Sequence, residues 1–305
     1  MTIFSGTWLE AVPFLVLGVL ISTVITVFVP EGFLQRIFPQ RLFPGLLFGV
    51  VGGFFLPVCD CASVPVFRSL IKKGIPLPAA VTFMTAAPII NPAAVLSTWY
   101  AYGGNVRMVA ARVGFGIVCA LLAGFFFSFR SSCYHFNEQE NHVECSCCSC
   151  SREPSATRFS YKLFEVLEHS REEFIEVGTW QITGIAVATV FQVWIKHTAA
   201  FSSLNSFHGI PGKMIPILGM MGLAFFLSLC SSSDAVICRV IGKGLSPAPQ
   251  LAFLVFGPMM DIKNIIMLSG MCSPKFAVRM AVTTFCICFL VMLGLSFSGL
   301  ESFLL

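Results

Sequence analysis

The sequence predicts an all-α, polytopic membrane protein made of two homologous halves. Of its 305 residues, 56% are hydrophobic and only 11% are charged, whereas a soluble domain carries roughly 25% charged residues. Long uncharged stretches recur along the chain, and two apolar stretches rich in glycine and proline each end in a short polar turn. This composition excludes a soluble enzyme and predicts a lipid bilayer as the surroundings. A net charge of +4 without a basic stripe gives no sign of a nucleic-acid partner.

Six apolar stretches are long enough, or nearly so, to cross a membrane, because a spanning helix needs about 20 apolar residues. They are residues 11–29, 74–106, 113–129, 177–195, 244–272 and 280–300. The first has neither the basic start nor the cleavage site of a signal peptide, so we expect it to remain in the mature protein.

Two further apolar stretches, residues 42–58 and 214–233, are predicted to be broken helices. Each contains several glycines and prolines and runs into a polar turn, Cys59-Asp60-Cys61-Ala62-Ser63 in one and Cys230-Ser231-Ser232-Ser233-Asp234 in the other. The apolar piece after each turn, about 11 residues at 1.5 Å per residue, covers only half of the bilayer. We therefore expect a re-entrant hairpin in each half.

The two halves resemble each other along their whole length. Glu10 matches Glu176, Cys59 matches Cys230, and Pro88 matches Pro258. If each half has three spanning helices and one hairpin, an odd number of crossings separates equivalent positions, and the second half is inverted. Inverted repeats around broken helices are typical of secondary transporters, whose binding site lies at the repeat interface near the midplane. Four crossings in each half would instead give a parallel repeat.

This duplication predicts three regions. They are a first membrane repeat over residues 1–130, a polar, cysteine-rich linker over 131–173, and a second membrane repeat over 174–305. The distribution of Lys and Arg favours a cytoplasmic linker with both termini outside. Apolar residues at helical spacing over 161–176 predict a short amphipathic helix on the membrane surface.

The three aspartates of the chain, Asp60, Asp234 and Asp261, all lie in the duplicated segments. Ionisable side chains at membrane depth are costly and are therefore functional candidates. We expect Asp60 to contact a solute or a coupling proton. Ser63 and Asp234 occupy matching positions in the two turns, where they are predicted to cap the following half-helix, a role compatible with substrate binding.

The turns also contain thiols, namely Cys59 and Cys61 in the first and Cys230 in the second. A thiophilic solute could use them as ligands, because soft ions prefer sulfur. The alternative is that buried cysteines serve as small hydrophobic side chains, which is our interpretation of three cysteines outside the turns: Cys119, Cys286 and Cys288.

A second pair of matching motifs follows the turns, with Pro88 and Asn91 in the first half and Pro258 and Asp261 in the second. Proline inside an apolar helix frees a carbonyl and kinks the chain. A discontinuity here would present Asn91 and Asp261 to the same cavity as the turns. The alternative is that the prolines only kink the helices and that Asp261 pairs with Lys263.

Other charged residues recur at equivalent positions. Glu10 and Glu176 start the first helix of each half, where interface anchoring is favoured over a proton relay. Arg68 and Arg239 follow the turns and either snorkel to the interface or pair with acids; we favour snorkelling.

The linker holds Cys145, Cys147, Cys148 and Cys150 within six residues. This is not the spacing of a folded zinc ribbon, but a flexible tract of this kind can bind a soft metal ion. The alternative is a dispensable polar loop. We expect no other cofactor, and the chain lacks a P-loop motif for ATP.

Four motifs together resemble the predicted-permease family: LPVCDCASVP at 56–65, AAPIINP at 86–92, CSSSDA at 230–235 and GPMMDIKN at 257–264. This family includes the ArsP-type organoarsenical efflux permeases and the YraQ- and YcgR-like proteins. The resemblance implies a multi-pass protein of the bacterial inner membrane that exports trivalent arsenicals. Carried over to this chain, it implies a permeation site built from Cys59, Asp60, Cys61, Ser63, Asn91, Cys230, Ser232, Asp234 and Asp261.

The leading hypothesis is therefore a permease, not an enzyme, that moves a small thiophilic or metalloid-linked solute by alternating access. One alternative is a membrane thiol-disulfide conduit that uses Cys59 and Cys230. Another is a subunit that needs a partner membrane protein or a second copy of itself.

Overall fold

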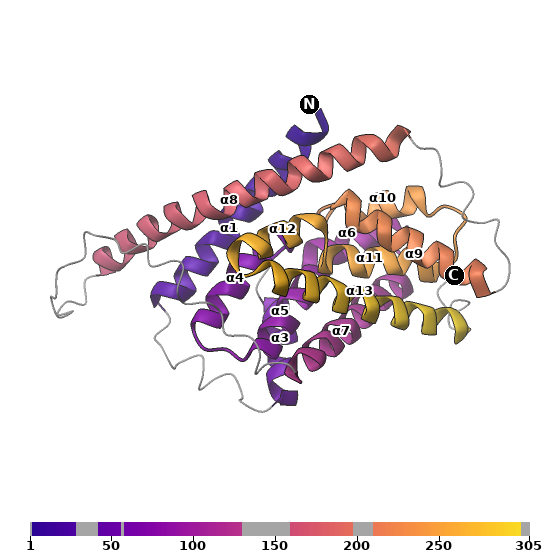
Figure 1. Cartoon of the computed structure of the whole chain (residues 1–305), viewed down its shortest axis with the longest axis horizontal. Coiled ribbons are helices and arrows are strands. Elements are labelled where there is room, and N and C mark those ends of the chain that lie inside the picture. Colours follow the sequence, from indigo (N-terminus) through magenta and orange to yellow (C-terminus); the bar gives the residue numbers. More distant parts are fainter. Residues whose placement is uncertain (1, 29–41, 56–57, 130–158, 198–209, 300–305) are drawn as a thin grey trace.

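The computed structural model describes residues 2–28, 42–55, 58–129, 159–197 and 210–299, and these residues form helices without any strand (Figure 1). The linker cysteines Cys145, Cys147, Cys148 and Cys150 lie outside the described residues, as do the side chains of Glu10 and Cys61. The prediction of an all-α protein is confirmed.

The same series of helices occurs twice along the chain. The first half contains α1 (Thr2–Phe28), α3 (Leu42–Phe55), α4 (Asp60–Lys72), α5 (Leu77–Ile90), α6 (Pro92–Ala101) and α7 (Val106–Ser128). The second half contains α8 (Phe159–His197), α9 (Ile210–Leu227), α10 (Asp234–Ile241), α11 (Pro247–Met259), α12 (Ile262–Met271) and α13 (Pro274–Phe297). Each half thus has a long first helix, a helix followed by a short one after the polar turn, a broken helix and a long last helix.

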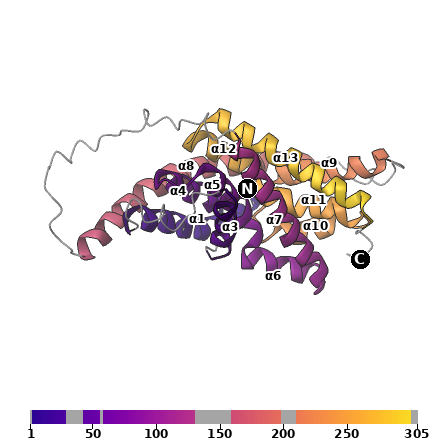
Figure 2. The ribbon, with the colours of Figure 1, turned by 90° about the horizontal axis from the view of Figure 1, so that it is seen from below.

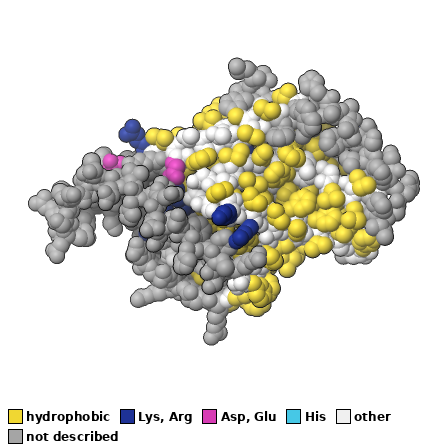
Figure 3. All heavy atoms as spheres, in the orientation of Figure 1, with side chains coloured by type: hydrophobic (Ala, Val, Ile, Leu, Met, Phe, Trp, Pro, Cys, Tyr) yellow, Lys and Arg dark blue, Asp and Glu magenta, His cyan; other side chains and the backbone are white. Residues whose placement is uncertain are grey.

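Four helical stretches among the described residues are long and apolar enough to cross a membrane: Leu77–Ala101, Val106–Ser128, Pro247–Met271 and Pro274–Phe297. Shorter apolar helices cover Ala11–Val24, Leu42–Phe55, Phe174–Val190 and Gly212–Leu227. Large hydrophobic side chains such as Val282 and Leu290 of α13 are exposed, and Figure 3 shows hydrophobic side chains spread over the face where α13 lies. These findings agree with a multi-pass membrane protein.

Helices α5 and α11 form the centre of the protein. Every residue of both helices is buried, and the two helices contact each other. The contacts between the halves are reciprocal: α4 lies against α12, while α6 lies against α10. Equivalent helices also pair, with α7 against α13 and α1 beside α8 (Figures 1 and 2). The short helix after each turn therefore packs on the broken helix of the opposite half.

The predicted second discontinuity is present in both halves. Helix α5 ends at Ile90 and α6 begins at Pro92, because a proline lacks the N–H that a continuous helix would need. Helix α11 ends at Met259, and α12 begins at Ile262. The turns before these helices also match, since Gly74 (φ +81°) and Gly244 (φ +90°) both adopt the left-handed conformation that favours glycine.

The structure differs from the sequence prediction at the start of the second half. Instead of a separate amphipathic helix over 161–176, a single helix, α8, runs from Phe159 to His197. No proline interrupts this segment, so the polar first turns continue directly into the apolar part of the helix.

Candidate functional site

The acid of the second turn, Asp234, is held by an arginine from the first half. Arg112 on α7 places Nη1 3.1 Å from Asp234 Oδ1 and Nη2 2.5 Å from Oδ2. Nη1 also donates to Thr98 Oγ1 on α6 at 2.5 Å. Arg112 and Asp234 are both buried. This two-bond arrangement is the strong, geometrically fixed form of an arginine–carboxylate pair.

The acid of the first turn, Asp60, is in turn held by a lysine from the second half. Lys263 Nζ on α12 lies 3.2 Å from Asp60 Oδ2 and 3.4 Å from Asp261 Oδ2. All three side chains are buried, with exposed fractions of 2% or less. Each turn acid is therefore paired with a cation from the opposite half, and one ammonium group serves two carboxylates. The expected alternative that Asp261 pairs with Lys263 is confirmed.

The second turn has a further contact with the first half, beyond the Arg112 pair. The second turn further contacts α6, because the Ser97 hydroxyl donates a short hydrogen bond to the Ser232 carbonyl. Each turn thus contacts the broken helix of the opposite half.

The helix caps are on residues other than those predicted. Asn91 Oδ1 accepts the N–H of Ala93 at 3.0 Å and caps α6, and Asp261 Oδ1 accepts the N–H of Asn264 at 2.7 Å and caps α12. The matching residues Asn91 and Asp261 therefore stabilise the second part of each broken helix.

The prediction that Ser63 and Asp234 are caps is wrong. Helix α4 already begins at Asp60, so the Ser63 hydroxyl lies within the first turn and donates to the Asp60 carbonyl at 2.8 Å. Asp234 is the first residue of α10, and its carboxylate binds the Arg112 guanidinium instead.

Asn264, one residue beyond Lys263, carries an unexplained polar group. Its side chain is 1% exposed, and neither Oδ1 nor Nδ2 has a hydrogen-bond partner among the described residues. A buried amide without partners is unfavourable by about 1–3 kcal/mol for each lost bond, and such groups are rare in native proteins. Its backbone N–H binds Asp261, so this amide belongs to the same site as the shared lysine.

Two further polar contacts join the halves nearer the surface. Arg68 on α4 binds Glu176 on α8 at 2.8 Å, and the guanidinium of Arg239 lies 5.3 Å from the ring centre of Tyr102. Arg68 therefore pairs with an acid, which is the alternative to snorkelling. Arg239 is exposed and contacts an aromatic ring, so snorkelling stays a prediction for it. Interface anchoring stays a prediction for Glu176, which forms this ion pair.

The turn cysteines occupy equivalent places. Cys59 and Cys230 are buried, and their carbonyl oxygens accept the backbone N–H groups that close the turns. The described cysteines form no disulfide with one another. No cluster of three His, Cys, Asp or Glu side chains with metal-binding geometry occurs in the described part of the chain. A multidentate site for a soft ion is thus not preformed by the described side chains at the turns.

The sequence as a whole is similar to a known family. A sequence model described as a predicted permease matches residues 1–297. The chain belongs to the predicted permease family. Its members are transporters and not enzymes. The permease is 35% identical over 277 residues to UPF0718 protein YcgR of Bacillus subtilis, covering 90% of this chain and 89% of that protein.

Two other relatives extend this comparison. A Streptococcus mutans protein, named as a subunit of a two-component membrane permease complex, is 32% identical over 285 residues, covering 93% of the permease and 90% of that protein. UPF0718 protein YraQ of Escherichia coli is 31% identical over 124 residues, 40% of this chain and 34% of YraQ. No solved structure matches the permease.

Sequence reasoning missed two members of the site, Arg112 and Asn264. Arg112 is the one charged residue between Arg107 and Arg130, and it directly precedes the predicted span 113–129. A lone arginine within an otherwise apolar segment was the available signal. Asn264 gave no such signal, because its lack of partners is visible only in three dimensions.

Proposed function

We propose that this permease is a secondary transporter of the bacterial inner membrane, built from two inverted repeats, that exports a small thiophilic or metalloid-linked solute such as a trivalent organoarsenical. The observation that carries the proposal is the crosswise pairing of the two turn acids. Both ion pairs link the halves, so both constrain a rocking movement of one half against the other. The reciprocal contacts of α4 with α12 and of α6 with α10 support a two-fold relation between the halves, which an inverted repeat also has.

The two ion pairs differ in how firmly they are held. Arg112 holds Asp234 with two bonds and is further fixed by Thr98, so this pair is the rigid one. Lys263 is shared between Asp60 and Asp261 at longer distances. Removing one partner from a buried pair is unfavourable by about 3–5 kcal/mol, so Lys263 leaves Asp60 only when a solute or a coupling proton takes its place. The shared lysine is therefore the part of the site that responds to transport.

The solute site would lie beside this lysine. The Asn264 amide supplies one donor and one acceptor that the described residues leave unused. Ionisable groups and broken helix ends supply the remaining polar surface. The proposed permeation site comprises the nine residues named above: Cys59, Asp60, Cys61, Ser63, Asn91, Cys230, Ser232, Asp234 and Asp261.

The remaining parts of the proposal concern organisation. The first membrane repeat covers residues 1–130, the linker 131–173 is cytoplasmic, and the second repeat covers 174–305, with α8 extending into the linker from Phe159. The four linker cysteines Cys145, Cys147, Cys148 and Cys150 would bind a soft metal ion.

A second candidate function is that of one subunit in a two-protein permease complex. The name of the Streptococcus mutans relative favours it. Affinity purification from a native membrane in mild detergent tests this directly. A second membrane protein that co-purifies in equal amount would support the complex, and a chain that transports alone after reconstitution would contradict it. Family membership favours transport over the thiol-disulfide conduit.

Reconstituted vesicles test the main proposal. Purified permease in liposomes with a proton gradient is mixed with a trivalent methylated arsenical, and uptake is followed by metalloid analysis. We expect uptake that Lys263→Met abolishes and Lys275→Met retains, because Lys263 is buried in the site and Lys275 is an exposed lysine of α13. Uptake equal to that of empty liposomes, or unchanged in Lys263→Met, would contradict the proposal.

A further inference from the structure

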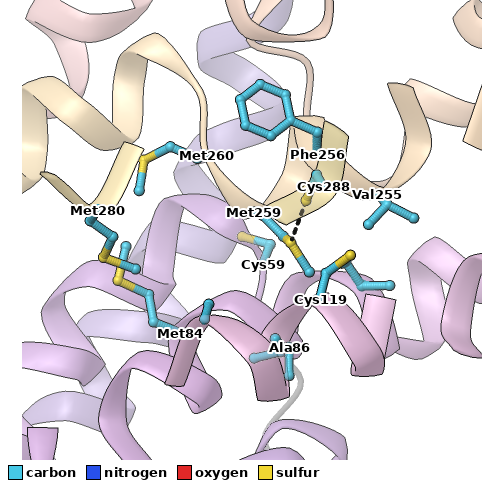
Figure 4. Packing of buried hydrophobic residues seen from close by; sticks show 14 of the residues in the cluster. Cys59, Met84, Ala86, Cys119, Val255, Phe256, Met259, Met260, Met280 and Cys288 are labelled. Atoms are coloured by element: carbon cyan, nitrogen blue, oxygen red, sulfur yellow. Dashed lines mark hydrogen bonds between the residues drawn. The ribbon is translucent and has the colours of Figure 1, made fainter. Parts of the chain in front are cut away.

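Three sulfur atoms from three helices converge at the contact between the halves, apart from the ion pairs. Cys288 Sγ on α13 lies 3.7 Å from Met259 Sδ on α11. The Cys119 side chain on α7 belongs to the same buried core and lies beside these two side chains (Figure 4). All three residues are buried, with exposed fractions of 1% or less. Figure 4 shows them together, with the sulfur–sulfur contact of Met259 and Cys288 drawn as a dashed line.

This sulfur cluster, defined as Cys119, Met259 and Cys288, joins both halves. Cys119 belongs to the first half, and the other two belong to the second. Met259 is the last residue of α11, directly before the break that contains Asp261. The cluster therefore lies where two contacting helices of different halves, α7 and α13, meet the end of a broken helix.

More sulfur surrounds this cluster. Cys59, Met84, Met260 and Met280 belong to the same buried core, and Figure 4 shows their side chains in the same region. Apolar packing alone needs no sulfur, because leucine and alanine fill such space equally well. Methionine adapts its shape to a bound group better than branched side chains do. A core of this composition is thus suited to a soft ligand that enters and leaves.

We propose that the sulfur cluster binds one soft monovalent cation, Cu(I) or Ag(I). Thiolate and thioether ligands select soft ions of this kind. One thiol would lose its proton on binding, so that the cation and the new thiolate form a neutral unit and one H⁺ is released. The other thiol and the Met259 thioether complete the site as neutral donors. A neutral complex suits this place, because uncompensated charge in an apolar interior is strongly unfavourable.

The bound cation would connect the two halves, because Cys119 and Cys288 belong to different ones. This inference goes beyond the proposed function and stands on the sulfur contacts alone. Only its consequence, that the cation holds the halves together, rests on the proposed rocking movement.

Metal titration of the purified full-length chain tests the inference. The five cysteines of residues 131–158 and the turn cysteines Cys59, Cys61 and Cys230 are first replaced by serine, so that neither the linker nor the turns can bind the probe. Ag(I) is titrated, and Cu(I) is titrated against a competing chelator. We expect one equivalent to bind with release of one proton. Loss of an outer-shell partner alone weakens metal sites 10–100-fold, so Cys288→Ser and Cys119→Ser are expected to weaken binding at least about 100-fold.

The chain offers a matched control. Cys286 lies two residues before Cys288 on α13 but is exposed, so Cys286→Ser leaves binding unchanged. X-ray absorption of the Cu(I)-loaded protein adds a readout that needs no cysteine variant: we expect sulfur ligands only, with one fewer in Met259→Leu.

Three results would overturn the inference. They are the absence of binding, binding that survives in Cys288→Ser, and binding that survives in Cys119→Ser. Because no gradient or solute is used, these results do not depend on whether the proposed transport occurs. Transport of an arsenical by a chain that binds no Ag(I) would contradict the cation site and leave the proposed transport function standing.

Discussion

The ammonium group of Lys263 lies 3.2 Å from a carboxylate oxygen of Asp60, although 203 residues separate them in the chain. The contact joins the first turn of one half to the broken helix of the other. Its counterpart joins Asp234 to Arg112 in the opposite sense. The polar centre of this permease is therefore held together by charges that each half supplies to the other.

Asp261 has two roles that substitution can separate. It caps α12 through Oδ1 and contacts Lys263 through Oδ2. Asp261→Asn keeps an oxygen for the cap, as Asn91 does in the first half, but removes the charge. We expect thermal unfolding in detergent close to that of the native chain, together with a strong loss of transport.

Asp261→Ala is the companion variant, because it removes the cap as well. We expect it to unfold with about 1 kcal/mol less stability than Asp261→Asn. Equal stability of the two variants would show that the cap contributes nothing.

Arg112 is expected to be irreplaceable by lysine. Lysine cannot reproduce the two bonds to Asp234 together with the bond to Thr98, because its ammonium group is a point charge and not a planar fork. Arg112→Lys should therefore lower the yield of folded protein and its unfolding temperature in detergent. Arg107→Lys on the same helix is the control, since Arg107 is exposed. A normal unfolding temperature for Arg112→Lys would argue against a structural role for the bidentate pair.

Substitution of Asn264 tests whether its side-chain amide serves transport or stability. If its unpartnered amide serves the solute, replacing it with leucine removes an unfavourable buried polar group, so stability should stay equal or rise. Transport should fall at least about tenfold, equivalent to roughly 1.4 kcal/mol of lost interaction. Unfolding and uptake measured on the same variant separate a role in transport from a role in stability. A variant that loses stability while transporting normally would mean that the amide is structural.

Helix packing depends on Gly124 of α7. A Cβ there would lie 1.9 Å from Thr82 Oγ1 and 2.8 Å from the Pro78 carbonyl oxygen on α5. Gly124→Ala must therefore separate α5 from α7, with a loss of about 1–3 kcal/mol. Gly114→Ala on the same helix meets nothing within 4 Å and serves as control. Unfolding in detergent measures both, and equal midpoints would contradict the packing.

The site could be predicted from the sequence because aspartate is rare in this chain. Asp60, Asp234 and Asp261 are conspicuous because charge is rare in this chain, and the internal duplication predicted that their segments meet. The breaks after Pro88 and Pro258 were likewise visible, because proline ends helices locally.

The partners of these acids could not be predicted in the same way. Asp234 and Arg112 are 122 residues apart, and only packing brings them together. The cap assignments failed because α4 begins at Asp60 and α10 begins at Asp234, so that Ser63 and Asp234 both lie inside the first helical turn. Cys119 and Cys288 are buried in the core, as expected of small hydrophobic side chains, but their neighbours could not be predicted, because nothing in the sequence places α7 against α13.

Double-mutant cycles test the central claim most directly. The cycle for Asp60→Asn with Lys263→Met, and the cycle for Asp234→Asn with Arg112→Met, are measured by unfolding in the same detergent. We predict a coupling energy of about 2–3 kcal/mol in each cycle, within the range for residues in contact. Additive effects within about 0.5 kcal/mol in both cycles would mean that the turns are not held by cations from the opposite halves.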